Sequence, residues 1–82
     1  MIEPIGERIA VEVLFQPGRM LPRSFSWRRR LYRVAEITSN WNVPEGQFRR
    51  YYFTVTTEQP NVYELMFSTK NMQWELTGIY HD

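Results

Sequence analysis

Apolar residues recur at every second position along most of the chain, which is the pattern of β-strands with one buried face. The first run covers Ile9–Phe15 and ends at the turn pair Pro17-Gly18. We expect residues 17–23 to form a connecting loop, because two prolines and a glycine in this stretch disfavour a regular ladder of hydrogen bonds.

The middle of the chain predicts a hairpin. Phe25 and Trp27 precede a tip at Arg29-Arg30, and Tyr32 and Val34 follow it. A two-residue turn at this tip would place Trp27 opposite Tyr32 and Phe25 opposite Val34. All four side chains would then share one buried face.

Residues 35–46 allow two interpretations. Apolar residues up to Trp41 fit the i, i+3, i+7 spacing of a helix, whereas the alternation before them fits a strand. A bulge near Ala35-Glu36 would move the apolar positions from one face to the other. We favour a bent strand to about Asn40, followed by a loop from Trp41 through Gly46.

The C-terminal third predicts a three-stranded meander. A loop at Gln59-Pro60-Asn61 and a turn at Lys70-Asn71 both place Tyr63, Leu65 and Phe67 on the buried face. The pairs expected from these turns are Thr57–Tyr63, Val55–Leu65, Phe53–Phe67, Phe67–Trp74 and Leu65–Leu76. The opposite face is mostly polar, and we expect it to be solvated; it comprises Tyr52, Thr54, Thr56, Glu64, Met66, Ser68, Gln73, Glu75 and Thr77.

These elements predict an all-β fold in a single domain that spans residues 1–82. Five to six short antiparallel strands with one apolar face must curl to bury that face in so small a chain. We therefore expect a strongly bent sheet or a partly open barrel, in which the first strand closes over the aromatic face.

Composition excludes several kinds of site. The chain has no cysteine and one histidine, so neither a disulfide nor a zinc or other transition-metal site is expected. No cofactor is expected either. A small domain without disulfides is typical of a reducing compartment, and we expect a cytoplasmic protein. No apolar run approaches the ~20 residues of a membrane span.

The charge distribution is strongly polarised. Eight of the nine arginines lie in residues 19–50, where the local charge is +6 although the whole chain carries only +1. Guanidinium groups form bidentate contacts with phosphate, and exposed rings stack on unpaired bases. The candidate nucleic-acid-binding residues are therefore Arg28, Arg29, Arg30, Arg33, Arg50, Trp41 and Tyr52, and we expect Arg50 to lie near Arg33 on the outer face.

The sequence shows no set of residues that is typical of an active site. His81 is the penultimate residue, where we expect a frayed tail. Glu64 and Glu75 would share the solvated face, which does not separate two pKa values as an acid/base pair requires. We expect a protein without enzymatic activity.

Two stretches resemble the signature of a small bacterial domain family of unknown function. In that family a W-R-G-x-x-Y-x-V-x-E-[VI] hairpin is followed by a tryptophan, a Y-[FW]-x-V strand and a V-Y-E-L strand. Here the hairpin is Trp27–Ile37, and the two strands are Tyr52–Val55 and Val62–Leu65; Arg29 replaces the turn glycine of the motif. The same domain occurs beside Y-family DNA polymerase-like proteins, so the resemblance implies a role in DNA transactions.

Three interpretations of the arginine cluster remain open. One is the binding of single-stranded nucleic acid, and another is an ordinary solvated surface whose arginines pair with glutamates such as Glu36. The third is a protein-interaction module that accompanies a DNA-repair or replication assembly and contacts an acidic protein surface. It would use the outward apolar residues Leu14, Leu31, Tyr52 and Met66. Exposed rings of Trp41 and Tyr52 beside the arginines would favour nucleic acid.

Overall fold

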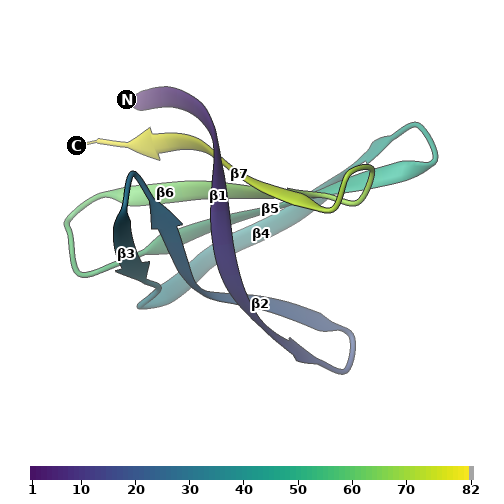
Figure 1. Ribbon diagram of the computed structural model, residues 1–82, viewed down its shortest axis with the longest axis horizontal. Coiled ribbons are helices and arrows are strands. Elements are labelled where there is room, and N and C mark those ends of the chain that lie inside the picture. Colours follow the sequence, from purple (N-terminus) through teal and green to yellow (C-terminus); the bar gives the residue numbers. More distant parts are fainter. Residues whose placement is uncertain (82) are drawn as a thin grey trace.

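The computed structural model describes residues 1–81, which form one antiparallel sheet of seven strands (Figure 1). The strands are β1 (Ile2–Gln16), β2 (Arg19–Trp27), β3 (Arg30–Arg33), β4 (Glu36–Glu45), β5 (Phe48–Thr56), β6 (Val62–Ser68) and β7 (Gln73–Tyr80). Their order across the sheet is β3-β2-β1-β7-β6-β5-β4. The all-β class and the antiparallel sheet are confirmed, whereas the expected number of five to six strands is too low. Within residues 1–81 no helix has the length and apolar character needed to span a bilayer.

Strand β1 joins two halves of the sheet. Its first part, Ile2–Ile9, pairs with β7, and its second part, Ala10–Gln16, pairs with β2. The pairing with β7 shifts register between Pro4 and Glu7, where Gly6 adopts a positive φ of 70°. Such bulges bend a strand and increase its twist. β1 therefore turns across β5–β7 at a steep angle (Figure 1) and carries β2 and β3 over them.

The two edges of the sheet meet at one end only. Val34 and Ala35 connect β3, at one edge, directly to β4, at the other. The Val34 N–H donates to the Arg23 carbonyl of β2 at 2.9 Å, and the Ala35 N–H donates to the Thr56 carbonyl of β5 at 2.8 Å. Beyond this junction no strand pair in residues 1–81 joins β2 or β3 to β4, so the sheet is curled but not closed.

The core is an aromatic cluster enclosed by the curl. The Phe25 and Tyr32 rings stack at 4.9 Å with an interplanar angle of 7°, and Tyr63 packs against them at 5.4 and 5.5 Å. Tyr63 lies on β6, so these contacts join the two halves of the sheet. The other buried members of the cluster are Phe53, Val55, Leu65, Leu76 and Ile79.

Two segments differ from the sequence-based expectation. Residues 17–23 are not a loop: β1 and β2 form a hairpin that turns at Pro17-Gly18. β2 accommodates Pro22 because it pairs with Val13 at a register shift, where a ladder hydrogen bond is already interrupted. Residues 36–45 form one strand with an irregularity between Ile37 and Ser39. The favoured strand to about Asn40 is thus confirmed and the alternative helix is wrong. The loop predicted from Trp41 is also wrong, because the strand continues to Glu45.

Two of the three expected hairpin registers are shifted by two residues. The turn at Lys70-Asn71 gives the expected pairs Phe67–Trp74 and Leu65–Leu76. The loop between β5 and β6 is longer than expected, so that Phe53 pairs with Leu65 and Val55 with Tyr63. The turn between β2 and β3 is at Arg28-Arg29, which pairs Phe25 with Tyr32 and Trp27 with Arg30. Because a shift of two leaves each side chain on the same face, the predicted core survives both errors.

The outer face is less solvated than expected. Thr54, Met66 and Ser68 are buried. The Thr38 and Ser39 hydroxyls lie 2.8 and 2.5 Å from the Thr54 hydroxyl. Short polar side chains on β4 and β5 thus hydrogen-bond one another on this face.

Replacing Phe25 by alanine should destabilise the protein by about 3–5 kcal/mol, because the ring is buried and links both halves of the sheet. Urea unfolding followed by tryptophan fluorescence measures the change. Leu31→Ala is the control, since that side chain is 58% exposed and its loss should change stability by less than ~0.5 kcal/mol. Equal losses in the two variants would contradict the assignment of the core.

Candidate nucleic-acid interface

The turn between β2 and β3 places two arginines in a left-handed backbone conformation. Arg28 has a φ of 51° and Arg29 a φ of 65°. Two-residue hairpin turns with positive φ at both positions normally contain Asn-Gly, because a Cβ atom clashes with the following carbonyl in this region. The strain amounts to roughly 1–2 kcal/mol for each residue with a Cβ atom. Both arginines are therefore held in conformations that their side chains disfavour.

Glu7 of β1 fixes Arg28 in place. The Arg28 Nη2 and Nε groups donate to the two Glu7 carboxylate oxygens at 2.7 and 3.3 Å, and the Trp27 Nε1 donates to the same carboxylate at 2.9 Å. The Arg28 guanidinium also lies 4.5 Å from the centre of the Trp27 ring. The hydrogen bonds from Arg28 and then from Trp27 lower the pKa of Glu7, and the hydrogen bond to Glu7 raises the pKa of Arg28.

Arg29, Arg30 and Arg33 have exposed side chains. No carboxylate of residues 1–81 lies within ion-pair distance of these three guanidinium groups. The Arg30 guanidinium lies 5.9 Å from the centre of the Tyr32 ring, so that ring supports the Arg30 side chain. Arg23 and Arg33 flank a shallow depression on the outer side of the hairpin, which Glu12 also lines. We call β2–β3 with Arg23, Arg28, Arg29, Arg30 and Arg33 the arginine hairpin.

The remaining predicted site residues lie elsewhere. Arg50 pairs with Val43 in the β4–β5 ladder, whereas Arg33 ends β3 beside the junction with β4. Thr56, at that junction, lies six positions along β5 from Arg50, which corresponds to roughly 20 Å. The expectation that Arg50 lies near Arg33 is therefore wrong, because β4 and β5 pair over their whole length.

Arg50, Trp41 and Tyr52 form a separate group on the outer face of β4 and β5. Arg50 donates to Glu45 at 2.5 Å, and Ser68 donates to the same carboxylate at 3.3 Å. The hydrogen bond from Arg50 lowers the pKa of Glu45, with a smaller contribution from Ser68. The Trp41 and Tyr52 rings stack at 5.2 Å with an interplanar angle of 0°, and Trp41 remains 40% exposed. The two rings are exposed in part, but they lie far from the arginine turn.

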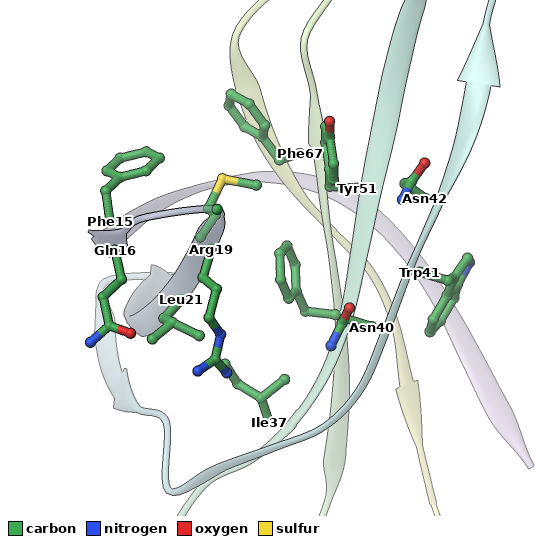
Figure 2. Close-up of a pocket in the computed structure, with 13 residues that line it drawn as sticks. Phe15, Gln16, Arg19, Leu21, Ile37, Asn40, Trp41, Asn42, Tyr51 and Phe67 are labelled. Atoms are coloured by element: carbon green, nitrogen blue, oxygen red, sulfur yellow. The ribbon is translucent and has the colours of Figure 1, made fainter.

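A groove that sequence analysis missed opens between the β1–β2 hairpin and β4 (Figure 2). Figure 2 shows Gln16, Arg19 and Leu21 on one side of the groove and Asn40, Asn42, Tyr51 and Phe67 on the other, with Trp41 on the far side of β4. Side chains alternate between the two faces of β5, so Tyr51 lies on the inner face together with Phe53. The sequence does not reveal the groove because it predicts loops at residues 17–23 and 41–46, where β2 and β4 form the two walls.

His81 and Glu64 each have hydrogen-bond partners of their own. Residues 1–81 contain no group of three or more potential metal ligands. His81 is not a frayed tail: its backbone N–H donates to the Met1 carbonyl at 2.8 Å, and its Nε2 lies 2.8 Å from Glu3 Oε1. Glu64 is half-buried and accepts hydrogen bonds from Thr77 at 2.7 Å and from Tyr80 at 3.0 Å. The bond to Glu64 raises the pKa of Tyr80.

Comparison with known proteins identifies one family. The profile of a family described as a domain of unknown function, DUF6504, matches residues 1–80. No curated protein and no solved structure matches the chain. The family match agrees with the resemblance to a small domain family of unknown function that the sequence motifs indicate.

The pKa of Glu7 predicts how acid affects the anchoring of the hairpin. Because folding lowers this pKa from 4.5, the Glu7 carboxylate stabilises the protein above that pH, and the contribution is lost as the pH falls through the lower folded value. The melting temperature of the wild type should therefore fall more steeply than that of Glu7→Gln as the pH falls below 4.5. Arg28→Gln should flatten the profile in the same way. Parallel profiles for wild type and Glu7→Gln would show that the ion pair contributes nothing.

Proposed function

The chain belongs to the DUF6504 family of domains, and we propose that it binds nucleic acid through the arginine hairpin, without catalysing a reaction. The contacts are made to phosphate groups by Arg29, Arg30 and Arg33. Arg28 holds the turn in shape through Glu7.

The observation that carries the proposal is the left-handed backbone of Arg28 and Arg29. Glycine or asparagine would relieve strain at these positions, and the motif that the hairpin resembles has glycine where this chain has Arg29. A strained residue persists when its side chain provides something that the relaxed residue cannot. Arg28 provides the contact with Glu7. The Arg29 guanidinium has no carboxylate of residues 1–81 within ion-pair distance, so what this arginine provides is a positive charge aimed at solvent.

The geometry favours contacts to the nucleic-acid backbone over stacking on bases. Tyr32 is buried, and the Arg28 guanidinium covers the Trp27 ring, so neither ring is available as a platform for a base. Planar guanidinium groups instead match phosphate oxygens in pairs. Binding of this kind depends on the phosphate charge and not on the base sequence. Single strands and duplexes should therefore both bind.

The motif resemblance adds a direction to this proposal. It relates the chain to bacterial domains that occur beside Y-family DNA polymerase-like proteins, which favours DNA over RNA as the natural ligand. A cytoplasmic protein would have access to that ligand.

Salt should weaken this binding in proportion to the phosphates contacted. Three arginine contacts predict a slope of log K against log salt of about −2 for a single strand and about −2.7 for a duplex. Fluorescence anisotropy of a labelled oligonucleotide and of its duplex, titrated at four salt concentrations, measures both slopes. Binding that is insensitive to salt would rule out the arginine hairpin as the interface.

Arg29→Gly separates binding from folding. The substitution should stabilise the protein by up to ~1 kcal/mol, since it relieves the left-handed strain. It should also weaken nucleic-acid binding several-fold and make the salt slope shallower by about 1, because one phosphate contact is lost. Thermal unfolding and the same anisotropy titration provide the two measurements.

Met72→Gly is the matched control for Arg29→Gly. Met72 has a φ of 57° in the turn after β6 and carries no charge. Met72→Gly should therefore raise the stability of the protein by an amount similar to that of Arg29→Gly and leave the affinity for nucleic acid unchanged. If Arg29→Gly binds as tightly as Met72→Gly, the arginine turn is not the site.

A further inference from the structure

The groove between the β1–β2 hairpin and β4 is a second surface, independent of the arginine hairpin. It has a volume of about 610 Å³ and an aromatic floor formed by Tyr51 and Phe53 of β5 and Phe67 of β6. Phe15 and Leu21 lie on the opposite wall, and Phe15 is 73% exposed. The exposed ring and the aromatic floor together provide apolar surface for a ligand to cover.

Free strand edges border the groove on both sides. β4 is the last strand of the sheet. β3 pairs only with Ser24–Trp27 of β2, so in residues 1–81 no strand covers Arg19–Pro22 on the side away from β1. The backbone groups of such edges that point away from the sheet lack ladder partners. An extended polypeptide is the ligand that satisfies them in a regular pattern.

The middle of β4 is unusually open to pairing. The irregularity between Ile37 and Ser39 interrupts the strand at one end, and Pro44 lacks an N–H at the other. Between them Ser39–Val43 forms a regular segment of about five residues, or ~17 Å. Edge strands are usually protected by charged side chains, but this segment carries none. The protection thus lies at its two ends and leaves the centre available.

The charges around the groove indicate what kind of segment fits. The residues that line it include Arg19 and no aspartate or glutamate. Arg49 lies beside it, where its Nη1 donates to the Asn42 side chain at 2.8 Å. Acidic side chains on the bound segment would complement both arginines. A second copy of this chain that used its own Ser39–Val43 would offer them no charge.

We propose that this groove receives an extended segment of a partner protein, which adds to β4 as a further strand beside Ser39–Val43. Alternate side chains of the segment are apolar and contact Tyr51, Phe53 and Phe67. Acidic residues at its ends face Arg19 and Arg49. The bound segment occupies part of the gap that leaves the sheet unclosed, and this role does not depend on nucleic-acid binding.

Selection of random peptides of about nine residues by phage display on the intact protein tests the proposal. The expected consensus alternates apolar residues and has Asp or Glu at its ends. Synthetic peptides of that consensus are then methylated at one backbone nitrogen at a time. Addition to a strand edge predicts that methylation at every second residue abolishes binding, while methylation at the residues between is tolerated. Hydrogen exchange should slow at alternate amides of Ser39–Val43 when the unmodified peptide is added.

Phe15→Ser should weaken peptide binding by about tenfold, because it removes an exposed wall of the groove without disturbing the core. Leu31→Ser, at an exposed position on the arginine hairpin, should have no effect on it. Three results would overturn the proposal: absence of a peptide consensus, methylation effects without two-residue alternation, or slowed exchange in β4 caused by self-association without peptide. Displacement of the peptide by a single-stranded oligonucleotide would also overturn it, since the groove would then be a nucleic-acid site.

Discussion

The structure depends on the shared pairing of β1, which holds β7 with its first part and β2 with its second. The bulge at Gly6 bends β1 between its two partners, so that the part paired with β2 turns away from the part paired with β7. The turn carries Phe25 and Tyr32 onto Tyr63, which creates the core. The same bend in β1 separates the β1–β2 hairpin from β4, and the groove lies between them. Core and groove are thus two consequences of one bend.

The arginine hairpin depends on β1 in a second way. Glu7 of β1 binds Arg28 and Trp27 together, so the position of the turn is set by the strand that forms the bend. Exposed ion pairs contribute little to stability in general. This contact therefore matters for the orientation of the hairpin more than for stability. It occupies the Arg28 guanidinium and leaves those of Arg29, Arg30 and Arg33 pointing into solvent.

The alternation of apolar and polar residues predicts much of the fold, but it predicts little of the candidate site. Alternation identified the buried face of β5, β6 and β7 correctly even where the register was shifted, because a shift of two preserves the face. Register itself depends on loop length, which the residues between Thr57 and Val62 do not reveal. Pro22 was misleading because a proline is tolerated where a bulge has already removed a hydrogen bond. The predicted position of Arg50 is wrong because its distance from Arg33 depends on the full length of β4, whereas the sequence predicts a loop from Trp41.

The ladder between β1 and β7 has a consequence for how the chain folds. Every other neighbouring pair in the sheet is a hairpin of consecutive strands, but this ladder pairs Ile2 with Tyr80. Contacts between distant residues form slowly, because the entropy of closing a long loop is lost before they are gained. We expect the hairpins to assemble as two separate units, β1–β3 and β4–β7, that dock through this ladder last. Until then each unit exposes an unpaired strand edge, so the slowest step of folding is also the one most open to aggregation.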